Sequence, residues 1–558
     1  MADTRTRADT GTRACAGTDS GADPGAVTGT GIGAGTGTGI GTRISTRPLL
    51  VLSLTFALLS LVLVPLNLPL GWDETVYASR FGPYAHGPAV PFSAPRTRGV
   101  PLLIAPVASW SDSVVLLRVW LTLLSSAALY LGFRPWLRVL PGRTAVVAGA
   151  LYGSLWFTLF YAGAAMPNHY TAMGATAATG LLLHDKGRPT PRTYAGIAVG
   201  TALATLMRPN DGAAVAAPLL LAAVCVPRCR GWGRALAVVG GFAAGAVPWA
   251  VEAVVRFGSV GARLREASDV QGGLRPGPSA LHQLTALDGP LLCRPCEGDR
   301  LQAVALEWWI VLPVLVTLGL WTLHRAGTST KLRTRTESRT CTKPSTPTRT
   351  KLRTRTKPST PTLTKPGTGT SPRARAAAWL ALAVGLCAAA PYLLLVPYGA
   401  PRFLLPAHAL LSLPAALGVL AVARLLRARL RSAAATAVIA AAVAGHLGAQ
   451  LPFTYTNTGI QSRARDDWPR VAAVLRDEGV RASCVLRGNT SVIPIAYATG
   501  CAAGPRGTRS GGTPPPDALV LRKAEPPGWA RGWPRHSVPD TYAQGWTVAL
   551  NPEPPHHP

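Results

Sequence analysis

Residues 48–80 of this chain read PLLVLSLTFALLSLVLVPLNLPL followed by GWDETVYASR, an apolar run that ends close to two acidic side chains. The apolar part, residues 48–70, has the length that crosses a bilayer as a helix, about 20 residues. Asp73 and Glu74 therefore stand where a first membrane helix reaches the membrane surface. Carboxylates beside lipid are costly and mark functional sites. We expect chemistry at this surface.

Apolar runs of similar length recur along the 558 residues, of which 48% are hydrophobic and 15% are charged. A soluble core would show amphipathic periods instead of whole apolar blocks. The sequence therefore predicts an α-helical multi-pass membrane protein with about eleven transmembrane helices. The predicted spans are 48–70, 112–133, 144–165, 168–184, 193–207, 211–227, 235–255, 303–323, 376–398, 403–423 and 432–451.

The basic residues predict how these spans are oriented. With the N-terminus inside, the inner loops hold most of the loop Lys and Arg, and residues 325–375 alone carry fourteen against one acid. The short outer loops hold only Arg208 and Arg402. This is the positive-inside bias of a plasma-membrane protein. The net charge of +31 then reflects topology, and we expect no nucleic-acid partner.

The remaining segments predict the domain organisation. Residues 1–47 lack an apolar period and are expected to be a disordered cytoplasmic tail. Residues 324–375, which repeat TKLRTRT and TKPSTPT, are expected to form a disordered basic cytoplasmic loop that could touch anionic headgroups. Two outer loops, 71–111 and 256–302, are long enough to fold. Residues 452–558 alternate a helix-like segment, DDWPRVAAVLRDEG, with the strand-like ASCVLRG and DALVLRK, which predicts a small α/β extracytoplasmic domain.

Four of the nine cysteines fall in predicted outer segments, and an even number there suits two disulfides. Cys484 and Cys501 would close a short loop in the C-terminal domain. Cys293 and Cys296, in CRPC, are expected to form a disulfide, with metal binding as the alternative. No second CxxC completes a tetrahedral metal site. We predict no metal ligands, although the outer-loop carboxylates leave a divalent cation possible.

Asp73 and Glu74 are the candidate catalytic residues. The alternative is a structural role, in which they pair with arginines at the lipid boundary. A carboxylate near apolar walls makes a good proton acceptor, and arginines suit a phosphate. Tyr77, Arg96 and Arg98 lie in the same loop and are candidate substrate-binding or lipid-phosphate-binding residues.

Four more candidates stand at predicted outer helix ends: His169 in MPNHY, Arg208 and Asp211 in RPND, and Arg402 in PYGAPRFLLPAHALLSLP. Each has an ordinary alternative, because a histidine at a helix end is often simply hydrogen-bonded and an arginine there often reaches for headgroups. Prolines on both sides of Arg402 fix the backbone. A rigid cation at the outer leaflet would suit a lipid phosphate.

Taken together, these motifs resemble a known family. The acidic pair with Tyr77, the proline-rich segment RTRGVPLLIAP after it, and the late segment RFLLPAHALLSLPAA are similar to the GT-C superfamily. More narrowly, they resemble the protein-mannosyltransferase and lipid A aminoarabinose-transferase group, glycosyltransferase family 39. The resemblance covers residues 48–451. The segment after the acidic loop lacks clear amphipathic helices, so the sequence does not predict the surface-lying helices of that family.

The resemblance implies a membrane glycosyltransferase domain over 48–451. It would move a sugar, a hexose such as mannose, from a polyprenyl-phosphate donor to a glycan, lipid or protein acceptor on the outer face of the cell envelope. By the same resemblance Asp73 matches the catalytic acid of the first loop, Glu74 its partner, and Arg402 the basic residue near the donor phosphate. Residues 452–558 match the variable outer domain. No other cofactor is implied.

Elementary chemistry agrees with this reaction. An outer transferase needs a lipid-delivered donor, a base for the acceptor proton and a cation for the departing phosphate. Asp73 and Arg402 meet these needs if folding brings them together, and the resemblance adds inversion at the sugar carbon. The alternative is a polytopic lipid or sugar transporter, which predicts mid-span ionisable residues or broken helices in matched halves. A membrane scaffold would leave the acids dispensable.

Overall fold

A computed structural model describes residues 45–553 except 89, 91, 185–188, 288–290, 292–301, 338–371, 491 and 505–514. The predicted tail over 1–47 lies almost wholly outside the described residues. So do most of the basic loop over 324–375 and the CRPC motif with Cys293 and Cys296. Everything below concerns the described part of residues 44–558, which form one compact unit.

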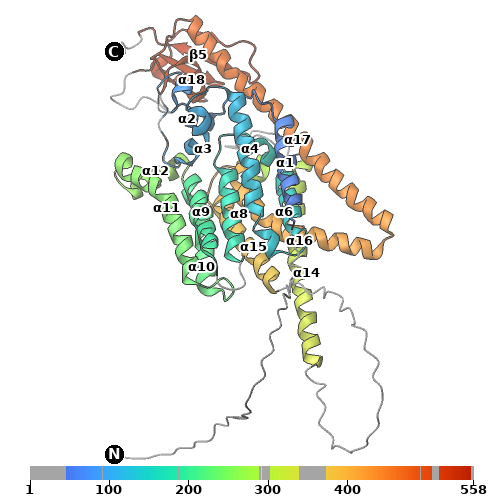
Figure 1. Ribbon diagram of the computed structural model, residues 1–558. Coiled ribbons are helices and arrows are strands. Elements are labelled where there is room, and N and C mark those ends of the chain that lie inside the picture. The colour runs from blue at the N-terminus through green and yellow to red at the C-terminus, as the bar shows by residue number, and fades with distance from the viewer. Residues whose placement is uncertain are drawn as a thin grey trace, which may run out of the picture. The chain divides into compact units, whose positions relative to one another are not determined.

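A helix coincides with each of the eleven predicted spans (Figure 1). Six helical segments among the described residues are long and apolar enough to cross a membrane, or seven if one bent pair counts as a span. The helices are α1 (Arg47–Leu63), α4 (Val114–Phe133), α6 (Thr144–Gly153) with α7 (Trp156–Ala162), α8 (Asn168–Leu182), α9 (Pro191–Met207), α10 (Pro209–Cys225), α11 (Trp232–Phe257), α14 (Glu307–Glu337), α15 (Pro372–Leu394), α16 (Leu405–Arg429) and α17 (Ser432–Asp477).

The predicted span over 144–165 is broken in the middle. Helices α6 and α7 meet at an angle of 78°. The break falls at Leu155, whose ψ of 132° is extended, so the helical hydrogen bonds cannot continue through it. After the bend, Tyr161 of α7 reaches Arg402 in the site described below.

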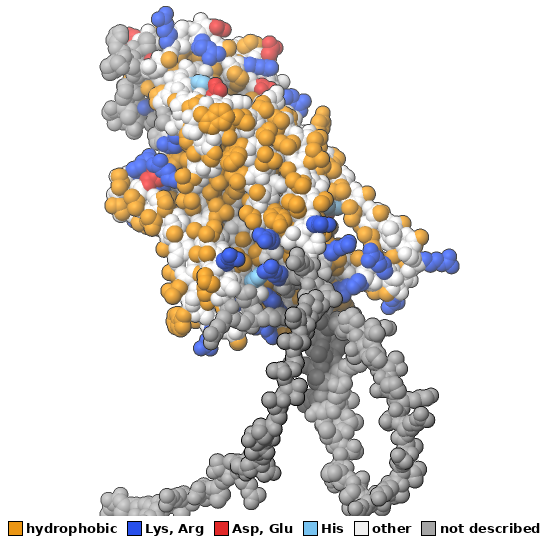
Figure 2. Space-filling view, in the orientation of Figure 1, with side chains coloured by type: hydrophobic (Ala, Val, Ile, Leu, Met, Phe, Trp, Pro, Cys, Tyr) orange, Lys and Arg blue, Asp and Glu red, His pale blue; other side chains and the backbone are white. Residues whose placement is uncertain are grey.

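Apolar side chains cover the middle of the bundle, and small residues hold its helices together. In Figure 2 hydrophobic side chains form a broad band, with Lys and Arg gathered at its lower end. Leu54, Leu58 and Val62 of α1 point outward, 57–71% exposed, as expected for a lipid-facing helix. Gly319 and Gly418 let α14 and α16 touch backbone to backbone, because a Cβ on either would lie 2.0–2.2 Å from a carbonyl oxygen of the other helix.

The loops at the upper end of the bundle contain short helices. Residues 71–111 form α2 (Trp72–Ala78), the 3-10 turn η1 (Gly82–Tyr84) and α3 (Gly99–Ala108). The second loop contains α12 (Val260–Val270), α13 (Ser279–Ala286) and η2 (Ala303–Leu306). Two further short elements are α5 (Trp136–Val139) and η3 (Pro401–Leu404). Helix α3 lies in the proline-rich segment, where the sequence predicted no clear helix. A helix forms there because Pro101 falls in the first turn and Pro106 near the end, where a proline costs little.

Helix α17 joins the bundle to the C-terminal domain. The predicted last span and the predicted helix at DDWPRVAAVLRDEG are one continuous helix of 46 residues. Pro452 and Pro469 both lie inside this helix. The two helices that the sequence predicts separately therefore form one element. The boundary expected at residue 451 is therefore not a break in the chain's secondary structure. Val471 and Leu475 of the last turns are buried against the C-terminal sheet.

The C-terminal domain is α/β, as predicted. Its five-stranded sheet has the order β2-β1-β3-β5-β4 and is parallel on the β1 side but antiparallel around β5. The elements are β1 (Val485–Gly488), α18 (Val492–Thr499), β2 (Ala502–Ala503), β3 (Ala518–Arg522), η4 (Gly528–Ala530), β4 (Arg535–Ser537) and β5 (Trp546–Leu550). The predicted Cys484–Cys501 disulfide is present and joins the start of β1 to the end of α18.

Candidate functional site

Helix α2 places the two acidic residues on different faces. Glu74 Oε2 accepts a 2.7 Å hydrogen bond from the Gly71 amide, which caps the start of this short helix. Successive helical side chains are about 100° apart, so Asp73 and Glu74 cannot face the same surroundings. Their exposure confirms the difference, since the Asp73 side chain is 25% exposed and that of Glu74 1%.

Asp73 lies between two arginines from distant parts of the chain. Arg96 Nη2 is 2.7 Å from Asp73 Oδ1, and Arg402 Nη2 is 3.3 Å from Oδ2. Burial by itself raises the pKa of Asp73, but the charges of Arg96 and Arg402 outweigh it and hold the pKa below its ordinary 3.8. The carboxylate is therefore ionised at neutral pH. The reaction inferred from the sequence required folding to bring Asp73 and Arg402 together, and the structure shows this contact.

A third arginine, Arg208, stands beside this pair at the junction of α9 and α10. Its Nη2 donates a 2.8 Å hydrogen bond to the Tyr392 hydroxyl, and its Nε lies 3.2 Å from Asp211 Oδ2. Tyr392 in turn donates to Asp211. The ring of Phe403 links the arginines, because the guanidinium groups of Arg208 and Arg402 lie 5.0 and 5.2 Å from its centre.

We call Asp73, Arg96, Arg208, Asp211 and Arg402 the arginine cluster. Tyr77 lies beside the cluster, one turn along α2 from Asp73, and its ring packs edge-on against Phe92 at 5.7 Å. Burial raises the pKa of Tyr77 to about 12, so its hydroxyl stays protonated. The cluster holds three positive and two negative side chains, an excess of one positive charge. An anion would be attracted to such a place.

Glu74 is saturated by protein partners. Its carboxylate receives both Nη groups of Arg118 from α4, Arg465 Nη1 from α17 at 3.2 Å, and the Ala165 amide at 2.8 Å, besides Gly71. Although burial opposes ionisation, Arg118 and the other donors lower the pKa of Glu74 to about 2. The residue thus ties the first loop to α4, to α17 and to the segment after α7.

Two sequence-predicted site residues lie elsewhere. Arg98 points away from Asp73 and pairs with Glu252 of α11 at 3.0 Å. His169 is 1% exposed inside the bundle, where Nε2 meets the Ser125 carbonyl at 3.0 Å and Nδ1 meets the Tyr152 hydroxyl at 3.1 Å. Among the described residues, no hydrogen bond or ion pair joins Arg98 or His169 to the arginine cluster, so the structure does not bring these two side chains together with Asp73. The reason is that helix α8 begins inside the packed bundle, not at an open helix end.

Several contributing residues were not singled out as site residues from the sequence. Tyr161 of α7 reaches Arg402 Nη1 at 3.4 Å, and Tyr392 bridges Arg208 to Asp211. No local pattern marks either tyrosine. The contact of Arg118 with the first loop could have been predicted. A charge inside an apolar span needs a counter-charge, and the nearest acids at a span end are in the first loop.

No group of three or more His, Cys, Asp or Glu side chains among the described residues is arranged to hold a metal ion. Asp288, Glu297 and Asp299 of the second loop lie outside the described residues, so the possible divalent cation stays a prediction.

The apolar helices and the polar cluster at their upper ends define a multi-pass membrane protein with an anion-attracting site at one end of its bundle. No model of a protein family matches this sequence, and no curated protein matches it. Among solved structures, ArnT from Cupriavidus metallidurans, bound to undecaprenyl phosphate, matches with a TM-score of 0.55 and 14% identity. The match covers 90% of this chain and 98% of ArnT. The oligosaccharyltransferase of Archaeoglobus fulgidus matches with a TM-score of 0.46 and 13% identity, over 83% of this chain and 64% of that one. The likeness to ArnT confirms the predicted GT-C fold.

Proposed function

We propose that this protein is an integral-membrane glycosyltransferase that moves a sugar from a polyprenyl-phosphate donor to an acceptor at the outer membrane face. The observation that carries the proposal is the Asp73 carboxylate held between Arg96 and Arg402 at one end of a GT-C bundle. The ArnT structure of the same fold contains undecaprenyl phosphate, which supports a polyprenyl-phosphate donor here. We expect the transferred sugar to be a hexose.

The arginine cluster would bind the donor phosphate. Guanidinium groups bind phosphate oxygens with two parallel hydrogen bonds, and three of them converge here. A polyprenyl-phosphate sugar is a phosphodiester with one negative charge, whereas the departing lipid phosphate carries close to two. Cations at this place therefore stabilise the leaving group more than the bound donor, which is the requirement for catalysis.

Asp73 would act as the general base. The acceptor hydroxyl attacks the anomeric carbon while the bond from that carbon to the phosphate oxygen breaks. The hydroxyl proton passes to Asp73, and the bond electrons leave with the lipid phosphate. In the free protein the arginines keep the pKa of Asp73 low. A bound phosphate competes for Arg96 and Arg402, which weakens their hold on Asp73 and makes it a stronger base.

We assign Glu74 a positioning role, which revises the sequence-based prediction that both acids are catalytic. Its oxygens are occupied by Arg118, Arg465 and two amides, and it is 1% exposed. A carboxylate so held can neither receive an acceptor proton nor touch a donor. It fixes the start of α2, and with it the direction of Asp73.

The proposed topology puts the arginine cluster and the C-terminal domain outside and the N-terminus inside. In Figure 2 the lower end of the hydrophobic band carries Lys and Arg without acidic side chains, whereas the upper end carries both, which suits an inner side at the lower end. The Cys484–Cys501 disulfide suits an oxidising compartment. Alkaline phosphatase fused after Pro558 should be active, whereas a fusion at residue 430 should not.

The deciding experiment uses purified protein in lipid nanodiscs with polyprenyl-phosphate mannose or polyprenyl-phosphate glucose. Release of polyprenyl phosphate is measured for wild type, Asp73→Asn and the exposed control Asp477→Asn. Loss of a general base should lower the rate by about 10²–10⁴-fold, and the control should match wild type. Full activity of Asp73→Asn would refute the assigned base. Movement of intact lipid between leaflets without sugar release would favour the transporter alternative.

A further inference from the structure

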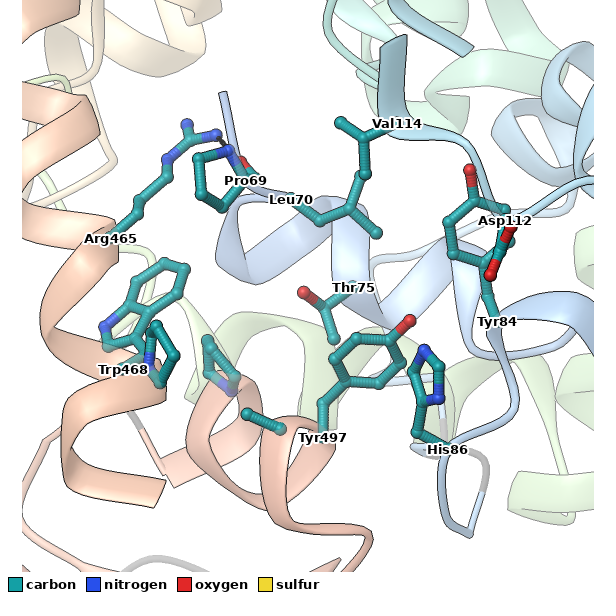
Figure 3. A pocket seen from close by; sticks show the side chains of 13 residues that line it. Pro69, Leu70, Thr75, Tyr84, His86, Asp112, Val114, Arg465, Trp468 and Tyr497 are labelled. Carbon is teal, nitrogen blue, oxygen red and sulfur yellow. Dashed lines mark hydrogen bonds between the residues drawn. The ribbon is translucent and has the colours of Figure 1, made fainter. Parts of the chain in front are cut away.

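A cavity of about 390 Å³ lies against α2 (Figure 3), the helix that also carries Asp73 of the arginine cluster. Its walls come from the first loop, the start of α4, the end of α17 and helix α18. Asp73 and Thr75 are two positions apart on α2, so their side chains point about 160° apart, and Thr75 lines the cavity. The arginine cluster and the cavity therefore share α2 as a common wall.

The first loop and the C-terminal domain are in close contact here. Gly87 and Gly500 approach so closely that a Cβ on Gly87 would lie 2.7 Å from the Gly500 carbonyl oxygen. Beside this contact the His86 and Tyr497 rings meet edge to face at 4.9 Å. The cavity is thus formed by two packed parts of the described chain.

Aromatic side chains line the cavity from opposite sides. Figure 3 shows Trp468 of α17 on one side, and Tyr497, His86 and Tyr84 on the other. The negative face of an aromatic ring attracts the weakly positive C–H groups of a sugar ring, so such walls suit the flat faces of a saccharide. The volume lies in the range of small-molecule sites, about 300–1,000 Å³.

Two polar side chains also line the cavity. The Tyr84 hydroxyl is buried without a hydrogen-bond partner among the described residues, and Asp112 lines the cavity with a carboxylate that is exposed to solvent. Burial, with Asp112 nearby, raises the pKa of Tyr84 to about 12, so the hydroxyl remains a donor. A buried polar group without a partner calls for one that the ligand supplies. Sugar hydroxyls both donate and accept, as this pair requires.

The charges disfavour other ligand classes. Asp112 is the acidic side chain of the cavity, and Arg465, already bonded to Glu74, is the guanidinium. A phosphate or nucleotide would meet the negative charge of Asp112, and an organic cation would meet the positive charge of Arg465. One acid and one base leave the cavity close to neutral, which fits an uncharged polyhydroxyl compound.

We propose that this cavity binds a neutral sugar unit of the acceptor, so that the acceptor is a glycan several sugars long. The inference rests on the proposed function, because it names that enzyme's acceptor. A helix with its side chains is about 10 Å across, so one sugar cannot fill the cavity and also meet Asp73. A distal sugar seated behind α2 would hold the chain while the terminal hydroxyl reaches the base.

Binding is tested without catalysis, with full-length protein in nanodiscs. The probes are mannotetraose, maltotetraose, the monosaccharides mannose and glucose, and a Ser- and Thr-rich peptide, followed by calorimetry and saturation-transfer NMR. We expect a tetrasaccharide to bind saturably with a dissociation constant of about 1 mM or lower. Tyr497→Ala should weaken binding about fivefold or more, because a stacked ring contributes about 1 kcal/mol beyond the area it buries.

Two variants separate binding from folding. Tyr84→Phe removes only a hydroxyl without a partner, so it should fold normally and yet bind the saccharide several-fold less tightly. Tyr542→Ala is the matched control, an exposed aromatic residue of the same domain outside the cavity, and should bind as wild type. Asp73→Asn should keep saccharide binding even though it loses transfer.

The outcomes are distinct. No saturable binding by either tetrasaccharide, equal binding by Tyr84→Phe and wild type, or binding of the peptide alone would each overturn the glycan acceptor while leaving the transferase proposal intact. Saccharide binding that fails with Tyr497→Ala, in a protein that releases no lipid phosphate from any donor, would support the cavity and refute the transferase.

Discussion

Replacing Glu74 by Gln removes one negative charge and almost no volume. It leaves Arg118 and Arg465, 3% and 9% exposed, beside each other without a counter-charge. Breaking a buried ion pair in this way costs about 3–5 kcal/mol. The pKa gives a similar value, because its fall from 4.5 to about 2 corresponds to about 3 kcal/mol at neutral pH. The ratio of folded to unfolded protein should drop by about 10²–10⁴-fold.

Unfolding by sodium dodecyl sulfate in mixed micelles, followed by circular dichroism, measures this loss. The matched control is Glu478→Gln, since Glu478 pairs with His536 at the surface at 2.7 Å and such a pair contributes about 0–1 kcal/mol. Adding Arg118→Met to Glu74→Gln should recover part of the loss, because the double change removes one of the two stranded charges.

The pH dependence has a definite sign. Since folding depresses the pKa of Glu74, its contribution is complete above about 4.5 and is lost as the pH falls towards 2. Wild type should therefore lose stability across this window more steeply than Glu74→Gln. A Glu74→Gln variant as stable as wild type but unable to release lipid phosphate would refute the positioning role and return Glu74 to the chemistry.

Further predictions concern the arginine cluster and the C-terminal domain. Arg402→Lys keeps the charge but loses the planar two-pronged donor, so sugar-transfer assays should show a rate lowered about 10-fold or more. Tyr392→Phe frees Arg208 and Asp211 from their shared hydroxyl and should raise KM for the donor more than it lowers kcat. Because the pKa of Asp73 lies below 3.8, kcat/KM of the wild type should stay level from pH 7 down to about 4 on the acid side. Cys501→Ser opens a loop of 17 residues and should destabilise the C-terminal domain by about 3 kcal/mol, measured by limited proteolysis with and without reductant.

Much of this molecule follows from composition and spacing. Apolar runs predict membrane helices because the bilayer leaves the backbone no other hydrogen-bonding partner. Each of the eleven predicted spans holds a helix, but the bend of 78° between α6 and α7 was not predicted, because its cause is one extended residue within an apolar run. The merged helix α17 was missed for a similar reason, since polar residues after 451 suggested a boundary that its hydrogen bonds ignore.

The candidate site also has a part that the sequence predicts and a part that it does not. Asp73 could be found from the sequence, because an acid at the exit of a membrane helix is conspicuous wherever the chain goes next. The separation of Asp73 from Glu74 could not be, since the adjacent acids look equivalent until α2 turns one towards Arg402 and the other towards Arg118. Arg98 and His169 were candidates by position alone, and their partners Glu252 and Ser125 are distant in the chain.

The sequence by itself determined which segments are helices in the membrane, which residue types stand at their ends, and that a carboxylate and several arginines were available. Only the tertiary structure decided which of them meet. Asp73 and Arg402 are 329 positions apart, and no local pattern encodes a contact over that distance. Hydropathy acts residue by residue and can be read along the chain, whereas an ion pair depends on how whole helices pack, and packing is set by all of them together.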